Sequence, residues 1–342
     1  MKFHNIFGKS NRTAQLYYQI SGKRFDALKD HVNENRFIDA PMIFISQLSR
    51  SGGTMLCQLF DGHSNCIVFP PELKFASHKT SIADLDALAT TSSEIARMRL
   101  IAANKSVIEK GLKGCFPKGV ETNVPFIFDM FAFNVLFRTL WSRRTPRSGR
   151  QVMNIWFSSF FSSWLNYQWP VKISYCTAFA SWTGVKEDNV DKFFRYYPDG
   201  YLIHVLRDPL SWYDSVKARS DRLHRRQTEM LGIYRDLKSA VYWYGKQAAV
   251  FERNLDKYPG RVMLITYDSL VSDRERVMKN ICRKVSIDYE SLLLRPTFNC
   301  VTVGRNTSFR DGKRRNELET HEVDEIQTHC LSIYEKLLGS CI

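Results

Sequence analysis

The chain contains 342 residues, of which 44% are hydrophobic and 13% aromatic, so it can bury a sizeable core and is neither intrinsically disordered, nor collagen-like, nor a small disulfide-stapled protein. Its 49 Lys and Arg against 35 Asp and Glu give a net charge of +14, which favours anionic partners such as nucleotides, acidic glycans, nucleic acid or anionic lipid. The length fits one large α/β domain with insertions.

The first part of the chain, residues 1–40, is polar and charged. It lacks the uninterrupted apolar stretch of a secretory signal, so we expect a cytoplasmic protein. The most apolar run, residues 124–141, contains Asp129, Asn134 and Arg138, and these side chains favour a buried or amphipathic helix over a transmembrane segment. The eight cysteines are dispersed and form no Cys-x-x-Cys pair, which predicts reduced thiols and neither a metal site nor a redox centre.

Three short apolar runs predict buried strands. The first, residues 42–45, leads into a Ser/Gly cluster and then into a helical pattern over residues 53–60. The second, residues 201–206, is followed by Asp208, which can cap the next helix. The third is residues 262–267. Continuous apolar strands separated by helices predict a parallel sheet that is covered on both faces and binds ligands at the carboxyl ends of its strands.

A long helix is predicted between the second and third strands. Its apolar residues alternate spacings of four and three and mark one face, which we expect to pack in the core. The helix should end at the Pro-Gly pair of residues 259–260. Residues 142–150 are polar and basic and predict an exposed loop inserted into the domain. The apolar face consists of Met230, Tyr234, Leu237, Val241, Tyr244, Ala248, Phe251 and Leu255.

The loop over residues 46–54, Ser-Gln-Leu-Ser-Arg-Ser-Gly-Gly-Thr, connects the first strand to its helix. Backbone N–H groups and the dipole at the start of a helix can hold an anion there. A phosphate loop of the nucleotide-hydrolysing type would need Gly at position 47 and Lys at position 53, where this chain has Gln47 and Gly53. An ordinary kinase or ATPase is therefore disfavoured, and a plain strand-to-helix turn is the other interpretation of the loop.

Arg207 and Ser215 follow the second predicted strand. If a helix starts near Pro209, Ser215 lies almost two turns along it, so that a guanidinium and a hydroxyl can hold one phosphate from two sides. The alternative is a capped helix with a surface arginine. His204, inside the same strand, is expected to be a core histidine.

Together these segments resemble the sulfotransferase family that uses 3′-phosphoadenosine-5′-phosphosulfate (PAPS). Residues 48–56 resemble the family's 5′-phosphosulfate loop, and residues 204–209 with Ser215 resemble its 3′-phosphate element. Residues 267–270, Tyr-Asp-Ser-Leu, resemble its Tyr-acid-x-Leu segment, whose tyrosine is implied to contact adenine. Residues 296–309 resemble a C-terminal pattern of bacterial members that closes over the donor. The resemblance implies an α/β fold with a central parallel sheet flanked by helices and a P-loop-like architecture.

Two positions depart from the family pattern. Gly53 replaces the commoner Thr, and Met55 stands where animal cytosolic members carry a Trp that stacks on adenine. The chain is therefore more similar to bacterial, carbohydrate and tyrosylprotein-type members than to those that act on steroids or phenols.

The resemblance implies one sulfotransferase-like domain over residues 1–342, with a core at about residues 40–310, a helical extension over residues 1–40 and a C-terminal helix over residues 310–342. It implies transfer of the sulfuryl group from PAPS to a hydroxyl or amine of an acceptor such as a carbohydrate or a small molecule. The product of the donor would be adenosine 3′,5′-bisphosphate, and no metal is required.

The resemblance also implies roles for individual residues. Arg50 aligns with the family's Lys or Arg that reaches the bridging oxygen of the donor, and it is the first catalytic candidate. The N–H groups of residues 51–54 and the hydroxyl of Thr54 are implied to hold the 5′-phosphate, and Arg207 and Ser215 the 3′-phosphate. The donor-binding residues implied are Arg50, Ser51, Gly52, Gly53, Thr54, Met55, Arg207, Ser215, Tyr267, Asn306 and Ser308.

A base must take the proton of the acceptor hydroxyl. Glu72 stands where tyrosylprotein-type members carry a Glu. His78 is the second candidate, because animal cytosolic members use a His, although from a different segment. A surface glutamate after a turn is the alternative interpretation of Glu72.

Two other functions remain as alternatives. A nucleic-acid or anionic-surface binding protein would use the positive charge, although no recognisable RNA or DNA module accompanies it and we expect no specific nucleic acid. A nucleotide kinase with a degenerate phosphate loop is the other. The aromatic stretch of residues 156–169 either lines an acceptor pocket or packs the core. The basic cluster near the proposed donor site consists of Lys217, Arg219, Arg222, Arg225 and Arg226.

Overall fold

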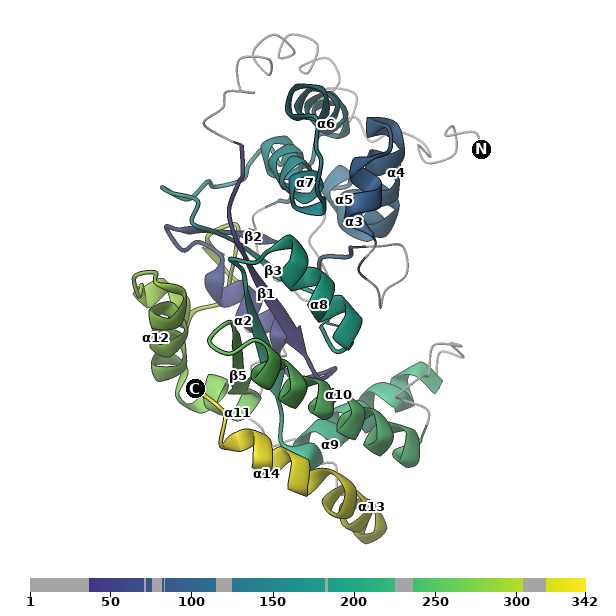
Figure 1. The fold of residues 1–342 in the computed structure, drawn as a ribbon. Helices are drawn as coiled ribbons and strands as arrows, with labels where there is room; N and C mark the ends of the chain where they lie inside the picture. Colours follow the sequence, from purple (N-terminus) through teal and green to yellow (C-terminus); the bar gives the residue numbers. More distant parts are fainter. Residues whose placement is uncertain are drawn as a thin grey trace.

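Five parallel strands form the central sheet, in the order β2-β3-β1-β4-β5 (Figure 1). The computed structural model describes residues 37–70, 72–75, 82, 84–114, 125–181, 184–224, 236–303 and 318–342. The strands are β1 (Met42–Gln47), β2 (Cys66–Phe69), β3 (Tyr175–Phe179), β4 (Tyr201–Leu206) and β5 (Val262–Thr266), and β6 (Thr297–Phe298) pairs with β7 (Val301–Thr302) in a separate antiparallel hairpin. The predicted α/β fold with a central parallel sheet is confirmed.

The three strands predicted from sequence are present. β1 is buried along its whole length, and β4 is buried after its first residue, because helices cover both faces of the sheet. β5 ends one residue earlier than predicted, at Thr266, whose hydroxyl accepts a hydrogen bond from the Ser269 N–H at 3.0 Å. That bond caps a short helix, α11 (Tyr267–Ser272), so Tyr267 begins a helix instead of ending a strand.

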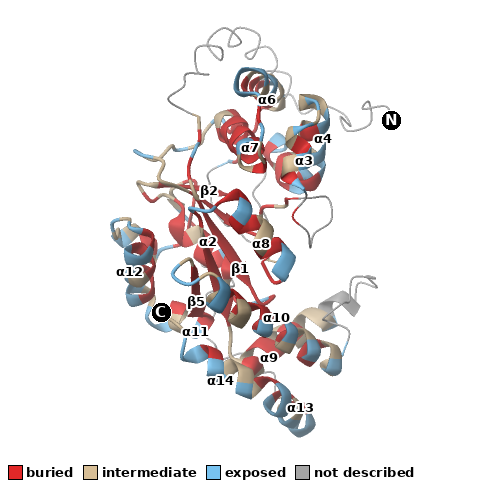
Figure 2. Cartoon of the chain, viewed as in Figure 1, coloured by how far each residue is buried: buried red, intermediate tan, exposed pale blue. Residues whose placement is uncertain are grey.

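Helices pack on the two faces of the sheet. They are α2 (Gly53–Phe60), α3 (Leu85–Ala89), α4 (Ser93–Ala103), α5 (Lys105–Leu112), α6 (Met130–Arg144), α7 (Gly149–Ser163), α8 (Glu187–Tyr196), α9 (Pro209–His224), α10 (Leu237–Lys257), α11, α12 (Arg274–Val285), α13 (Thr320–Ile326) and α14 (Ser332–Leu338). Ile45, Val205 and Ile265 share a core with α2 and α12, whereas the opposite face packs against α7, α8, α9 and α10. Figure 2 shows the sheet as a buried layer with the exposed residues on the outer sides of the helices.

The predicted helices that start and follow the strands are also observed. α2 covers the predicted residues 53–60, and α10 ends at Lys257, just before the Pro-Gly pair. Of its predicted apolar face, Met230 and Tyr234 lie outside the described residues, and the other members are buried or half-buried. His204 is fully buried, as expected of a core histidine, and its ring stacks on Phe251 with 3.9 Å between the ring centroids.

The predicted exposed loop over residues 142–150 is wrong in its bounds. α6 continues to Arg144 and α7 begins at Gly149, so that only residues 145–148 connect the two helices. Basic residues in the last turn of α6 interact favourably with the helix dipole, which explains why a basic stretch is helical here. Ser148 ends the connection by capping α7 with its side chain.

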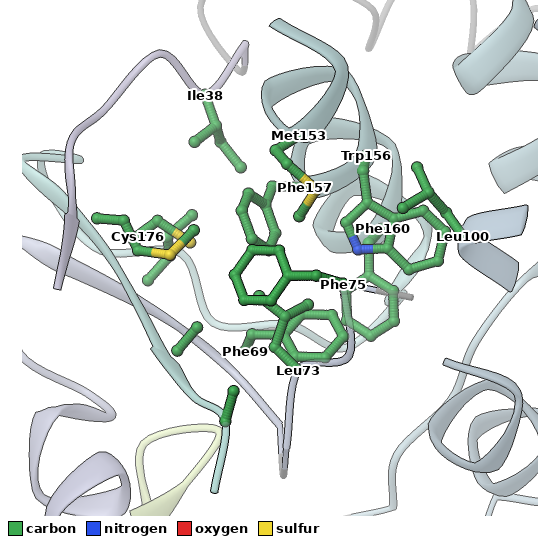
Figure 3. Packing of buried hydrophobic residues seen from close by; sticks show 14 of the residues in the cluster. Ile38, Phe69, Leu73, Phe75, Leu100, Met153, Trp156, Phe157, Phe160 and Cys176 are labelled. Atoms are coloured by element: carbon green, nitrogen blue, oxygen red, sulfur yellow. The ribbon is translucent and has the colours of Figure 1, made fainter. Parts of the chain in front are cut away.

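The aromatic residues of α7 pack in the core. Trp156 and Phe160 are 0% exposed, and Phe157 is 1% exposed. Figure 3 shows these three side chains in one packed cluster with Phe69 of β2, and the rings of Phe69 and Phe160 are 4.7 Å apart between centroids. Of the two interpretations of residues 156–169, core packing is therefore correct for α7.

The structure also bears on the cysteines and on membrane-spanning helices. The described cysteines are free thiols, of which five are buried and two, Cys300 and Cys341, are half-buried; Cys115 lies outside the described residues. Within the described part of the chain, no helix combines the length and the apolar character needed to cross a membrane.

Candidate active site

Five loops meet at the carboxyl edge of the sheet. β1 lies between β3 and β4, and the chain proceeds first to β2 and β3 on one side of β1 and then to β4 and β5 on the other. Such a reversal of strand order opens a crevice at the strand ends, which is where ligands bind in α/β sheets. Along this edge the candidate residues follow the strand order, with Glu72 after β2, the loop of residues 48–52 after β1, Arg207 after β4 and Tyr267 after β5.

The loop after β1 makes two left-handed turns. Arg50 has a φ of 73° and Gly52 a φ of 92°, and for an arginine this conformation costs about 1–2 kcal/mol. Two side chains from beyond β4 hold the turn: Arg207 Nη1 donates to the Arg50 carbonyl at 2.9 Å, and Trp212 Nε1 donates to the Ser49 carbonyl at 2.7 Å. The surrounding contacts thus impose the strained conformation of Arg50.

Neither loop glycine has room for a side chain. A Cβ on Gly52 would lie 2.6 Å from the Tyr267 ring, and a Cβ on Gly53 would lie 2.4 Å from the Phe179 ring and 3.0 Å from Gln47 Oε1. The close approach of Phe179 and Gln47 gives the physical reason why Gly53 stands where the resembling family commonly has Thr.

The backbone N–H groups of the loop have different partners. The Ser51 N–H donates to the Leu48 carbonyl at 3.1 Å, and the Gly53 N–H donates to Gln47 Oε1 at 2.5 Å. Thr54 is exposed, but Met55 is 1% exposed and belongs to the core shared with α12. The Met55 side chain therefore packs in the core, and the contact between Met55 and the donor stays a prediction.

Arg50, Arg207 and Ser215 are brought together. Arg50 Nε donates to Ser215 Oγ at 3.3 Å, and the guanidinium of Arg207 lies 4.4 Å from the ring centroid of Tyr267. α9 begins at Pro209, as predicted. The predicted cap is also present, because Asp208 Oδ1 accepts from the Ser211 N–H at 2.8 Å. Two guanidinium groups and a hydroxyl at one edge of a sheet form a cationic site.

Two buried donors at this site have no hydrogen-bond partner among the described residues. They are the hydroxyl of Ser51 and Nε of Arg207. Buried polar groups are almost always hydrogen-bonded, and each one left without a partner is destabilising. Both atoms belong to segments that the sequence predicts to bind phosphate, so a bound anion is the kind of ligand that fits them.

Tyr267 is 8% exposed. Its ring lies between Gly52 and the guanidinium of Arg207, and burial raises the pKa of its hydroxyl. In this position the ring supports the anion loop and Arg207, whereas a contact with adenine stays a prediction.

Glu72 lies on the other side of β1. It is half-buried, and its Oε1 accepts a hydrogen bond from the backbone N–H of Ser181, two residues after β3, at 3.3 Å. The next residues are fixed as well, because the side chain of buried Asn104 bonds both the N–H and the carbonyl of Lys74. Glu72 therefore extends from an ordered segment at the sheet edge.

Three predicted site residues, His78, Asn306 and Ser308, lie outside the described residues. The hairpin that leads toward the last two is described. Its Cys300 N–H donates to Asp61 Oδ2 at 2.9 Å, directly after α2. Burial raises the pKa of Asp61 to about 6, and the Cys300 hydrogen bond only partly opposes this rise.

Sequence reasoning missed Gln47 and Ser181 as site residues, together with Trp212 and Tyr244, whose hydroxyl donates to the Arg207 carbonyl at 2.9 Å. One sequence feature could have pointed to Gln47 as a site residue, because it occupies a position where a nucleotide-hydrolysing loop carries glycine. The other three make their contacts across the fold, and no local pattern reveals them.

The basic cluster on α9 is partly neutralised. Lys217 Nζ lies 2.7 Å from the buried Glu322 of α13, and Arg225 and Arg226 lie outside the described residues. Over the described ranges, no group of three or more His, Cys, Asp and Glu side chains is placed to hold a metal ion.

Known protein families and solved structures were compared with this chain. A sequence model of the sulfotransferase family matches residues 41–291. The chain is similar to the sulfotransferase domain from the curacin biosynthetic pathway, with a TM-score of 0.53 and 17% identity, covering 87% of this chain and 98% of that chain. For the sulfotransferase domain of the Synechococcus PCC 7002 olefin synthase, the TM-score is 0.48 and the identity 16%, over 85% and 96% of the two chains. For retinol dehydratase in complex with retinol and PAP, the TM-score is 0.36 and the identity 13%, covering 91% of this chain and 86% of that chain. A search of curated proteins found no match.

Proposed function

Because the chain belongs to the sulfotransferase family, we propose that it transfers the sulfuryl group of PAPS to a hydroxyl or amine of a glycan or small-molecule acceptor. The observation that carries the proposal is the cluster of Arg50, Arg207 and Ser215 beside an anion loop. A donor with one phosphate at the 3′ position and a phosphosulfate at the 5′ position needs two anion sites on one sheet edge, and this edge supplies both.

On the donor side, Arg207 and Ser215 hold the 3′-phosphate. A hydroxyl both accepts and donates, so Ser215 can keep the hydrogen bond from Arg50 and still donate its own proton to a phosphate oxygen. The 5′-phosphate is held by the N–H groups of Gly52 and Thr54 and by the exposed Thr54 hydroxyl, since the N–H groups of Ser51 and Gly53 donate to the Leu48 carbonyl and to Gln47 Oε1. The Ser51 hydroxyl, which has no partner among the described residues, is a further donor for it.

In the transfer step, the acceptor oxygen forms a bond to sulfur while the bond from sulfur to the bridging phosphate oxygen breaks. The acceptor proton passes to the Glu72 carboxylate, and negative charge develops on the leaving oxygen, where the Arg50 guanidinium stabilises it. The remaining contribution of the protein is to position the two reactants in line. Glu72 follows β2 and bonds Ser181 after β3, whereas the Arg50 side chain bonds Ser215 beyond β4, so the two groups have their partners on opposite sides of β1.

Calorimetry with adenosine 3′,5′-bisphosphate and with AMP, in the presence of a chelator, tests the proposal. We expect the bisphosphate to bind at least tenfold more tightly, because Arg207 and Ser215 act on the 3′-phosphate alone. Arg207→Ala should weaken this preference. Arg276→Ala is its matched control, since Arg276 is an exposed arginine of α12 that pairs with Asp273. Equal affinity for the two nucleotides would contradict the donor assignment.

A further inference from the structure

Gln47 is a buried polar residue at the end of β1, and both ends of its side-chain amide are used. It is 7% exposed. Its Oε1 accepts from the Gly53 N–H at 2.5 Å, and its Nε2 donates to Ser181 Oγ at 3.3 Å. A backbone N–H can only donate, so the oxygen of the amide must face Gly53 and the nitrogen must face Ser181. The orientation of this side chain is therefore determined by its partners.

The hydrogen bonds continue to Glu72. The backbone N–H of Ser181 donates to Glu72 Oε1 at 3.3 Å. One path of hydrogen bonds thus runs from the first residue of α2, through Gln47 and Ser181, to the carboxylate of Glu72. It crosses from β1 through the end of β3 to the segment after β2.

We infer that Gln47 and Ser181 are positioning residues, which hold the Glu72 carboxylate at a fixed place relative to the anion loop. The inference rests on the proposed function, because it assigns Glu72 as the base. A base acts efficiently only when its oxygen stays within hydrogen-bond reach of the proton it removes. Glu72 lies on a different strand connection from the loop, and the hydrogen bonds of the Gln47 amide and of Ser181 link the two segments.

A simpler role for Gln47 is to cap α2, since Gly52 has no side chain to satisfy the first N–H groups of that helix. That role accounts for the Gly53 end of the amide but gives no function to the Ser181 end. Ser181 therefore distinguishes the two explanations. Its hydroxyl contacts Gln47, whereas its backbone N–H contacts Glu72, so a change of the side chain weakens the path without removing either the cap or the Glu72 hydrogen bond.

The test compares Ser181→Ala with Ser181→Thr, which keeps the hydroxyl. Sulfate release from PAPS with water as the acceptor provides the rate, because water must also lose a proton to the base. We expect Ser181→Ala to lower kcat about tenfold, with unchanged affinity for adenosine 3′,5′-bisphosphate and unchanged KM for PAPS, and Ser181→Thr to restore most of the rate. Ser174→Ala is the control, because Ser174 directly precedes the other end of β3 and its hydroxyl bonds Asn65 there.

A double-mutant cycle gives the decisive readout. In a Glu72→Gln background, Ser181→Ala should cause no further loss of kcat, because the group that it positions no longer acts. If the double variant loses kcat by the product of the two single-variant factors, the inference is wrong. An unchanged kcat in Ser181→Ala would also overturn it, as would a loss of bisphosphate affinity in that variant. If Glu72→Gln itself releases sulfate at the wild-type rate, the positioning role is also wrong. Failure of the wild-type chain to bind the bisphosphate would instead refute the proposed function as a whole.

Discussion

Arg207 donates a hydrogen bond from Nη1 to the backbone carbonyl of Arg50 at 2.9 Å. The bond joins the residue that follows β4 to the left-handed turn that follows β1. Arg50 therefore depends on Arg207, because Arg207 holds the conformation in which Arg50 reaches Ser215. The two anion sites of the proposed donor complex form one connected structure.

Two replacements of Arg50 should differ in stability but not in activity. The φ of 73° at this position suits glycine, so Arg50→Gly should be more stable to urea than Arg50→Ala by about 1 kcal/mol. Both variants should lose about a hundredfold or more in transfer rate at every pH, because a charged donor to the leaving oxygen is lost. A rate loss confined to one end of the pH range would argue against this role.

Arg207→Ala should weaken binding of adenosine 3′,5′-bisphosphate by about 1.5–3 kcal/mol, the value of a charge-assisted hydrogen bond. AMP has no 3′-phosphate, so its affinity should hardly change. Calorimetry with both nucleotides measures the difference. An equal loss for AMP would indicate that the variant damages the loop through the Arg50 carbonyl instead of removing a phosphate contact.

Glu72→Gln should keep the affinity for the donor and lose general-base assistance of about 10²- to 10⁴-fold. Transfer rates, with bisphosphate binding as the control, test both expectations. Wild-type transfer in this variant would remove Glu72 as the base and make His78 the next candidate.

Gly53→Thr should destabilise the protein, even though threonine is common at this position in the resembling family. Its Cβ would lie 2.4 Å from the Phe179 ring, and overpacking of this kind costs about 1–3 kcal/mol. Urea unfolding of the variant provides the measurement. Phe179→Leu in the same chain should recover part of the loss, and an equally unstable double variant would show that the ring is not the obstacle.

Asp61→Asn should stabilise the chain at neutral pH. Burial raises the pKa of Asp61 from 3.8 to about 6. Between those two pH values the folded chain binds more protons than the unfolded chain, so the Asp61 contribution to stability falls as the pH rises. We expect the variant to exceed the wild type by up to about 3 kcal/mol at pH 7 and to match it below about pH 4.

His204 contributes in the opposite direction. Burial lowers its pKa from 6.5 to about 3, so between these values the unfolded chain binds the additional proton and stability rises with pH. Comparison of Asp61→Asn with the wild type at each pH cancels this contribution. A difference between the two chains that is constant with pH would contradict the assignment to Asp61.

The sequence predicted the elements that its local patterns encode. β1, β4 and β5 are continuous apolar runs, and Asp208 marks the start of α9 by its position before Pro209. β2 and β3 were not predicted, because β2 has only four residues and β3 mixes Tyr, Cys and Thr with its apolar residues. These two strands place Glu72 and Ser181 at the site.

The contacts within the site join residues that are far apart in the sequence, so no local sequence pattern predicts them. Gln47 and Ser181 are separated by 134 positions, and Arg50 and Ser215 by 165. The convergence of Arg50, Arg207 and Ser215 followed from the edge rule for parallel sheets. The hydrogen bonds among them depend on side-chain packing, which the sequence alone does not give.

The order of the elements along the chain also separates most of the donor contacts from the proposed base. The donor contacts proposed above come from residues 50–54, 207–215 and 267, whereas the proposed base and its support at Ser181 belong to the long stretch between the end of α2 and β4. Insertions, deletions or exchanges in that stretch alter the acceptor side without rewriting a single donor contact. A lineage with this topology can change what it sulfates while inheriting unaltered the machinery that recognises the activated sulfate.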